Sequence, residues 1–275
     1  MNCYNRMDIK DMIKMALKED IGGKDITTTA IIPKNKYVKA ILLAKEDCVI
    51  CGLGIAAEVF KVKDKNIRFK TLVLDGQKIN KGRVIARIFG RAQSILTAER
   101  VALNFVSLLS GVATKTREYV DKVKPYKVKI LDTRKTIPGL RVLEKYAVRM
   151  GGGYNHRMRL DDMVMIKDNH LKALGGVRSL PRVPKGYLCE IEVNNLQEFK
   201  QALRLKPDII MLDNMQAGQI KKAVMLRKGV KPKIEASGNV NLNNIREIAK
   251  AGPDMISIGA LTHSVKTIDI SLEIL

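Results

Sequence analysis

Apolar positions in the first hundred residues follow two different spacings. Residues 8–20 carry apolar side chains at helical spacing: Ile9, Met12, Ile13, Ala16 and Leu17. We expect an amphipathic helix there, with Asp8 placed to cap it. Strand signals follow in segments 37–50, 66–74 and 83–89, and residues 52–62 predict a helix between the first two. Together these elements predict a mixed sheet-and-helix unit.

From residue 92 to residue 124 the spacing is again helical. Ser110-Gly111 interrupts this stretch, so the sequence predicts a pair of helices with a break at these residues. We place a domain boundary within the pair. The expected domains are an N-terminal α/β sandwich over residues 1–105 and an incomplete α/β barrel over residues 106–275.

Beyond the helix pair, short β-rich runs alternate with helical segments. The six runs read KVKIL, MVMIK, LCEIEV, DIIML, KPKIE and DMISI. Such alternation is typical of a parallel sheet. Six units suit an incomplete barrel better than a full one of eight. The C-terminal IDISLEIL is compatible with either domain, and its tail could return to the first one.

Polar or small residues follow every one of these six runs. They are Asp132 to Lys135, Lys167 to His170, Glu190 with Glu192, Asp213 with Asn214, Ser237 to Asn239, and Ser257 with Gly259 and Ala260. In (β/α) barrels the chemistry sits at the carboxyl ends of the strands. We therefore expect the six ends to converge on one mouth.

Glu190 and Glu192 alternate with Ile191 and Val193, which predicts that both carboxylates point into the barrel. Buried carboxylates need cations opposite them. The candidates are Arg134, Lys135, Lys167 and Lys233. A purely structural ion-pair network is the alternative for any one of these residues.

Two late loops have the composition of a phosphate site. Ser237-Gly238-Asn239 precedes a helix and Gly259-Ala260 follows the next strand, where free backbone amides would face an anion. Plain turn chemistry is the alternative. Gly151 to Gly153 indicate either a helix end or a close backbone approach to a ligand. His156 and Arg157 follow directly, and a surface loop is their alternative.

Lys and Arg exceed Asp and Glu by 50 to 28, giving a net charge of +22. The excess suggests nucleic acid as a partner. However, the lysines are scattered, aromatic residues make up only 4% and there is no Trp, so stacking platforms are few. A cleft that attracts small polyanions fits the same charge. We expect no nucleic-acid partner.

Cys48 and Cys51 have the spacing of metal ligands, but no second pair follows them. With Cys3 and Cys189 they make four cysteines, too few for a disulfide framework in a chain of this length. We assign them no metal. No run of 18 apolar residues and no signal-peptide core is present, so we expect a cytoplasmic protein without a membrane partner.

Six motifs in the chain resemble those of quinolinate phosphoribosyltransferase, in that family's order. They are Leu96 to Phe105, Leu131 to Thr136, Gly151 to Arg157, Ile166 to His170, Leu212 to Asn214 and Glu235 to Gly238. The resemblance runs over nearly the whole chain. It implies a homodimer, or a hexamer of dimers, in which the neighbouring subunit lends Arg100 to the site.

The resemblance also implies a role for each matching position. Quinolinate carboxylates and donor phosphates would be bound by Arg134, Lys135, His156, Arg157 and Lys167, with Thr133 beside them. Glu192 and Asp213 would face the ribose and its magnesium, either directly or through water. The 5-phosphate would be held by Ser237, Gly238, Asn239, Ile258, Gly259 and Ala260. Catalysis would fall to Lys167, Glu192 and Asp213.

The implied reaction transfers a phosphoribosyl group from phosphoribosyl pyrophosphate to quinolinate and releases carbon dioxide, forming nicotinate mononucleotide. Once the ring nitrogen is alkylated, the pyridinium accepts the electrons of the broken carbon–carbon bond. We therefore expect Mg²⁺ and no organic cofactor. We infer transfer first and decarboxylation second.

The chain departs from the family pattern in two places. The segment from His170 to Glu190 is short and contains Pro181 and Pro184, which predicts a short or broken helix. Arg159 stands where a smaller residue is expected and would add a cation near the mouth.

Three other functions are alternatives to this one. A related phosphoribosyltransferase could act on a monocarboxylate such as nicotinate, or resemble the barrel paralogue found with molybdate transport genes; Lys167 to His170 favours the quinolinate enzyme. A nucleic-acid-binding protein would show steep salt dependence of binding. A catalytically silent phosphate-binding scaffold would not need Lys167, Glu192 and Asp213.

Overall fold

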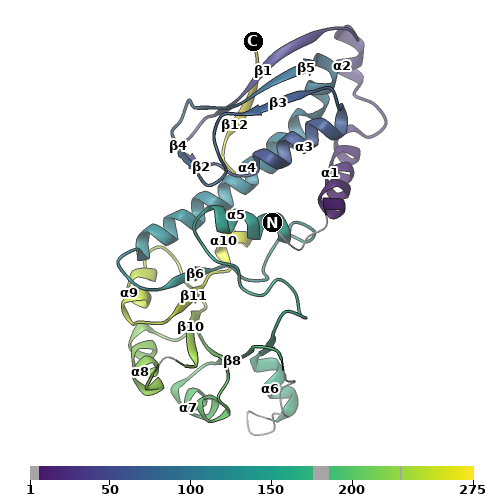
Figure 1. The fold of residues 1–275 in the computed structure, drawn as a ribbon. Coiled ribbons are helices and arrows are strands. Elements are labelled where there is room, and N and C mark those ends of the chain that lie inside the picture. Colours follow the sequence, from purple (N-terminus) through teal and green to yellow (C-terminus); the bar gives the residue numbers. More distant parts are fainter. Residues whose placement is uncertain (1–5, 176–185, 230) are drawn as a thin grey trace. The chain divides into compact units, whose positions relative to one another are not determined.

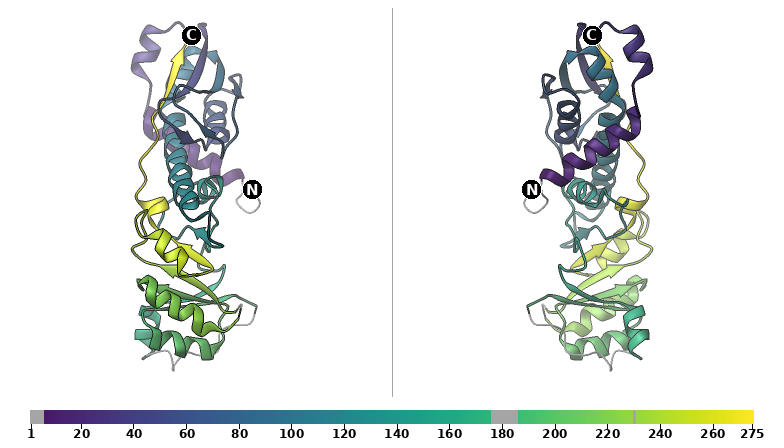
Figure 2. Two further views of the ribbon diagram at one scale, coloured as in Figure 1. Left: turned by 90° about the vertical axis from the view of Figure 1, so that its left-hand side faces the viewer. Right: turned by 90° about the vertical axis from the view of Figure 1, so that its right-hand side faces the viewer.

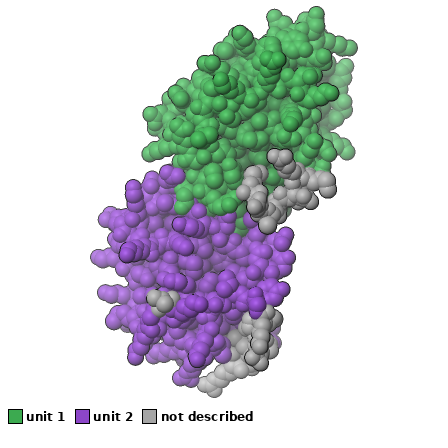
Figure 3. All heavy atoms as spheres, viewed as in Figure 1, with its two compact units in different colours: residues 1–115, 138–152, 265–275 green, residues 116–137, 153–264 purple. Residues whose placement is uncertain are grey.

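The computed structural model describes residues 6–175, 186–229 and 231–275, and it divides the chain into two compact units. Unit 1 comprises residues 1–115, 138–152 and 265–275, and unit 2 comprises residues 116–137 and 153–264 (Figure 3). Helix α4 (Ala92–Val123) runs through both units and contains the boundary drawn from the sequence.

Unit 1 is built on a four-stranded antiparallel sheet of order β12-β1-β5-β3. Its strands are β1 (Tyr37–Ala44), β3 (Arg68–Thr71), β5 (Val84–Arg91) and β12 (Ile270–Ile274). A separate ribbon pairs β2 (Cys48–Val49) with β4 (Lys78–Ile79). The helices are α1 (Arg6–Ile21), α2 (Ile26–Ile31), α3 (Leu53–Lys63), α5 (Arg141–Met150) and the first part of α4 (Figure 1).

The C-terminal strand belongs to unit 1. Strand β12 pairs antiparallel with β1, with Leu272 opposite Leu42 (Figure 2). The first predicted helix is confirmed as α1, which begins at Arg6, so Asp8 lies within its first turn. The Asp8 side chain lies outside what the structure describes, and its capping role stays a prediction. The predicted segment 37–50 contains β1 and β2, and segment 66–74 contains β3. Segment 83–89 covers β5 except for its last two residues, and helix 52–62 corresponds to α3.

The predicted break at Ser110-Gly111 is wrong, because α4 is continuous over 32 residues. Ser110 donates to the Cys51 carbonyl at 3.2 Å and accepts the Cys51 N–H at 3.0 Å, so the hydroxyl joins the helix to β2 and its following turn. A Cβ on Gly111 would lie 2.3 Å from the Lys266 carbonyl oxygen. The serine and glycine therefore serve close packing within unit 1 rather than a helix end.

Helix α4 is long and apolar enough to cross a membrane, but 67% of its most apolar window is buried inside the structure. Ile95, Ala102 and Leu109 on this helix have no exposed surface. Burial of this kind is typical of the central helix of a folded core, so the apolar length of α4 is accounted for by packing.

Unit 2 is built on a six-stranded parallel sheet of order β6-β11-β10-β9-β8-β7. Its strands are β6 (Lys129–Leu131), β7 (Val164–Ile166), β8 (Cys189–Val193), β9 (Ile209–Asp213), β10 (Lys233–Ser237) and β11 (Met255–Ser257). Its helices are α6 (Asp168–Leu174), α7 (Leu196–Leu205), α8 (Ala217–Arg227), α9 (Ile245–Lys250) and α10 (Ala260–His263). Every predicted β-rich run forms one strand, and the expected incomplete α/β barrel is confirmed.

Two departures inferred from the sequence fall near this sheet. Helix α6 has only seven residues and is followed by Gly175 as its C-cap, whose φ is 77°. Pro181 and Pro184 lie outside the described residues. Arg159 pairs with Asp161 at 3.0 Å, its side chain is 60% exposed, and it does not line the cavity described below. Its expected place near the mouth therefore stays a prediction.

The described cysteines are buried thiols. Burial raises the pKa of Cys48 to about 11 and raises the pKa of Cys51 further, because the thiolate form loses its hydration. Cys189 is buried as well, and its pKa is raised for the same reason. Within the described ranges, the grouping of metal-capable side chains includes none of them. Cys3 lies outside the described residues.

Candidate functional site

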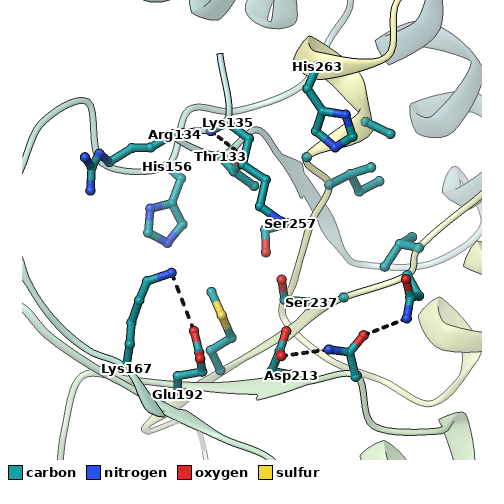
Figure 4. Close-up of a pocket in the computed structure, with 18 of the residues that line it drawn as sticks. Thr133, Arg134, Lys135, His156, Lys167, Glu192, Asp213, Ser237, Ser257 and His263 are labelled. Atoms are coloured by element: carbon teal, nitrogen blue, oxygen red, sulfur yellow. Dashed lines mark hydrogen bonds and ion pairs between the residues drawn. The ribbon is translucent and has the colours of Figure 1, made fainter. Parts of the chain in front are cut away.

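The carboxyl ends of all six strands of unit 2 line one cavity of about 840 Å³. Its walls contain these residues singled out from the sequence: Thr133, Arg134, Lys135, His156, Arg157, Lys167, Glu192, Asp213, Ser237, Gly238, Asn239, Ile258, Gly259 and Ala260. The parallel sheet brings them together because every strand ends at the same edge. Figure 4 shows side chains from separate strands pointing into this space.

Lys167, Glu192 and Asp213 form the charged floor of the cavity. The Lys167 Nζ lies 3.7 Å from a Glu192 carboxylate oxygen. Burial raises the pKa of Glu192, the Lys167 cation opposes that shift, and the Asp213 carboxylate adds to it. Asp213 accepts the Asn214 side-chain amide at 2.7 Å, which holds it at the end of β9 (Figure 4).

His156 and Arg157 lie on a segment that extends the sheet beside β6. The bridge between Tyr154 and Leu131 aligns this segment in parallel with the strand. Asp132, fully buried, accepts the His156 N–H at 2.9 Å and fixes the loop. Desolvation lowers the pKa of Arg157, and the neighbouring Arg134 cation lowers it further. Two guanidinium groups that repel each other favour a bound anion between them.

The loop after β10 is shaped by a glycine. Gly238 has φ +87°, and a Cβ there would lie 2.3 Å from Asn214 Oδ1. Asn239 donates to that same oxygen at 3.0 Å. Only glycine meets both demands, so Gly238 keeps the backbone of this loop against the end of β9.

The loop after β11 lies against the loop after β6. Thr262 of α10 donates to the Lys135 carbonyl at 2.6 Å. A Cβ on Gly259 would lie 3.0 Å from the His263 Nε2 and equally close to the Lys135 side chain. Small residues here leave room for the phosphate-sized group that the sequence predicts.

Several lining residues were not singled out from the sequence, namely Met165, Met211, Val240, Asn241 and His263. His263 could have been found from helical spacing, because its N–H bonds to the Gly259 carbonyl four residues earlier. The two methionines follow the alternation of β7 and β9 and give the floor an apolar part.

Four residues singled out from the sequence do not line the cavity. Lys233 stands at the start of β10 and pairs with Asp254 at 3.3 Å, so its predicted place opposite the barrel carboxylates is wrong. Gly151 caps the end of α5 and Gly152 has φ +92°, which is the helix-end alternative. Arg100 is an exposed residue of unit 1.

Glu192 and Asp213 suit magnesium, which prefers carboxylate oxygens. Both carboxylates face one cavity, and the Asp213 charge adds to the burial that raises the pKa of Glu192. A cation bound between them would relieve this repulsion. A second grouping, His156 with Glu190 and Glu235, has ligand atoms within 4.8 Å of one another. His156 lines the cavity, whereas the two carboxylates are fully buried and do not line it.

Comparison with known proteins gives one family for both units. Residues 25–110 match the N-terminal domain of quinolinate phosphoribosyl transferase, and residues 112–273 match its C-terminal domain. A probable nicotinate-nucleotide pyrophosphorylase (carboxylating) from Synechocystis is 42% identical over 273 residues, covering 97% of this chain and 92% of the relative. A quinolinate phosphoribosyltransferase (decarboxylating) from Nicotiana tabacum is 43% identical, covering 97% and 82%.

The fold has a close counterpart among solved structures. The nicotinate-nucleotide pyrophosphorylase from Francisella tularensis superimposes with a TM-score of 0.94 at 41% identity, over 100% of this chain and 98% of the other. The similarity therefore includes both units and the connections between their elements.

Proposed function

Because this chain belongs to the quinolinate phosphoribosyltransferase family, we propose that it transfers the phosphoribosyl group of phosphoribosyl pyrophosphate to quinolinate and decarboxylates the adduct. The products are nicotinate mononucleotide, pyrophosphate and carbon dioxide, so the enzyme is a pentosyltransferase of pyridine nucleotide biosynthesis.

One observation carries the proposal: cationic side chains from three loops, two carboxylates and two glycine-containing loops all line the same cavity. Arg134, Arg157 and Lys167 suit the two carboxylates of quinolinate and the pyrophosphate of the donor. The backbone at Gly238 and Gly259 suits the 5-phosphate. A monocarboxylate would leave part of this positive charge without a partner.

In the transfer step, the quinolinate nitrogen attacks the anomeric carbon of the ribose while the bond from that carbon to pyrophosphate breaks. The leaving oxygen keeps the electron pair. Lys167 stabilises the charge that develops on pyrophosphate, and Glu192 or Asp213 stabilises positive charge on the ribose. No covalent intermediate with the protein is needed.

In the second step, the bond between the ring and its 2-carboxylate breaks, and carbon dioxide leaves. Its electron pair stays on the ring carbon beside the positive nitrogen, and a proton then adds to that carbon. In the preceding transfer step, magnesium held by Glu192 and Asp213 would supply further positive charge to the departing pyrophosphate. The positive charge on the ring nitrogen stabilises this electron pair, so no organic cofactor is required.

We extend the proposal to a cytoplasmic homodimer, or a hexamer built from dimers, in which Arg100 of one subunit completes the cavity of the other. Arg100 is exposed on α4 and suits a carboxylate. This arrangement uses no nucleic-acid or membrane partner.

The test is to incubate the purified protein with phosphoribosyl pyrophosphate, magnesium and either quinolinate or nicotinate. We expect nicotinate mononucleotide and carbon dioxide in equal amounts from quinolinate alone. Turnover of nicotinate only would assign the protein to the monocarboxylate class. Quinolinate labelled in its 2-carboxylate, supplied without the donor, should release no carbon dioxide; release would overturn the order of steps.

A further inference from the structure

Beneath the cavity floor, two fully buried carboxyl groups meet one histidine. Glu190 of β8 and Glu235 of β10 have no exposed surface. The His156 Nε2 lies 3.0 Å from a Glu190 oxygen and 3.6 Å from a Glu235 oxygen. His156 also lines the cavity, so this buried group connects directly to the candidate site.

The hydrogen bonds of His156 fix its tautomer. The backbone N–H of Arg157 donates to Nδ1 at 2.7 Å, so Nδ1 is an acceptor and carries no proton. The ring proton therefore resides on Nε2, where it is donated to Glu190 at 3.0 Å. A second ring proton would collide with the Arg157 N–H, so the imidazole is held neutral in this position.

Glu235 lacks such a donor. Neither of its carboxyl oxygens has a hydrogen-bond partner among the residues that the structure describes. The ionisable groups facing it are Glu190 of β8, Asp132 after β6 and His156, and the Ser257 hydroxyl of β11 lies beside it. Two of these are acidic, and the histidine is neutral, so no formal positive charge among them balances a second buried carboxylate.

We propose that Glu235 is a positioning residue: it holds a proton at neutral pH, and its uncharged carboxyl keeps His156 in the Nε2–H form between the Arg157 N–H and Glu190. Burial first and the Glu190 charge second raise the pKa of Glu235, to about 8, and His156 opposes the shift only in part. Loss of this proton places a second negative charge beside Nε2, which draws a proton to the ring and displaces the Arg157 amide.

The direct test is nitrogen-15 NMR of the histidine rings in the unmutated protein. The chain has three histidines, so His156 is assigned by comparison with variants of His170 and His263. We expect His156 to remain a neutral Nε2–H tautomer from about pH 5 to pH 7, while an ordinary histidine titrates near 6.5. An Nδ1–H tautomer, or titration of His156 in that range, overturns the proposal.

A second test uses Glu235→Gln, because glutamine imitates a neutral carboxyl. A carboxyl with a raised pKa in the folded state stabilises the fold below the unfolded pKa and loses that contribution as pH rises toward the folded value. The difference in melting temperature, Glu235→Gln minus the unmutated protein, should therefore increase as the pH is raised from about 5 to 8, and then level off.

The exposed Glu247 of α9 provides a matched control, and its glutamine variant should show no such trend over that range. If the difference for Glu235→Gln is equally flat, Glu235 is ionised and the proposal fails. The proposal also fails if the purified protein contains one equivalent of zinc and Glu235→Gln contains none, because His156, Glu190 and Glu235 would then be zinc ligands.

The kinetic test rests on the proposed function. The kcat/KM for quinolinate should fall above about pH 8 in the unmutated enzyme, Glu235→Gln should remove that fall, and Glu235→Ala should lower kcat/KM about tenfold at every pH. An unaltered alkaline fall in Glu235→Gln contradicts the proposal. The NMR and melting tests need no turnover, so they separate a failure here from a failure of the proposed reaction.

Discussion

At the scale of single residues, the site depends on charges held close together with little water. Lys167 offsets the desolvation of Glu192 across 3.7 Å, and His156 is fixed by a backbone amide on one side and Glu190 on the other. Residue types at strand ends could be read from the sequence. Which nitrogen of His156 carries the proton could not, because it depends on contacts with residues distant along the chain.

Lys167→Met tests the charge at the floor. Without the cation, burial and Asp213 raise the pKa of Glu192 further, and the departing pyrophosphate loses a point charge. We expect kcat to fall about 100-fold. Lys172→Met is the matched control, because Lys172 pairs with Asp168 on the exposed side of α6 and its side chain is 73% exposed. Equal losses in both variants would contradict a specific role for Lys167.

Gly238→Ala tests the loop after β10. The added Cβ meets Asn214 Oδ1 at 2.3 Å, which displaces the loop proposed to hold the 5-phosphate. The KM for phosphoribosyl pyrophosphate should rise about tenfold or more. Gly252→Ala shares the positive φ, +90°, but its Cβ would meet only Val224 at 3.7 Å. It should lower stability without changing KM; a raised KM in both variants argues for general strain.

At the scale of elements, periodicity located the strands well. All six parallel strands of unit 2 follow the β-rich runs of the sequence. The error was in α4, where a serine and a glycine suggested a helix break. Their role is to admit the Cys51 backbone and the Lys266 carbonyl, and such long-range packing leaves no periodic signal.

Gly111→Ala tests this packing role. Because the Cβ would lie 2.3 Å from the Lys266 carbonyl oxygen, the helix and the 265–275 segment must move apart. We expect a loss of about 2 kcal/mol in unfolding free energy, followed by thermal melting. Gly54→Ala in α3 meets nothing within 4 Å and should be neutral or gain up to about 1 kcal/mol. Similar behaviour of both variants would refute the close approach.

At the scale of the whole molecule, the net charge of +22 is spread over both units. Arg134, Arg157 and Lys167 bring part of it to the cavity of unit 2, which we propose binds anionic substrates. The proposed reaction also requires a second copy of the chain, since Arg100 is expected to act across subunits.

Subunit complementation tests this sharing. Arg100→Ala and Lys167→Met should each be nearly inactive alone. After mixing under conditions that exchange subunits, a mixed dimer contains one site with both changes and one with neither, so activity should recover to about a quarter of the unmutated value. No recovery, despite mixed dimers detected by mass spectrometry, would place Arg100 in the site of its own subunit or outside it.

The sequence alone determined the class of fold, the six strands and the residues at their ends, because these depend on spacing between neighbours along the chain. The resemblance to one family rested on the same local order. Only the tertiary structure decided that β12 joins the sheet of unit 1, that Lys233 pairs with Asp254, and that the buried Glu235 carboxyl lies near His156 without a hydrogen bond among the described residues. Each depends on desolvation or contact between distant segments, which a local pattern does not record.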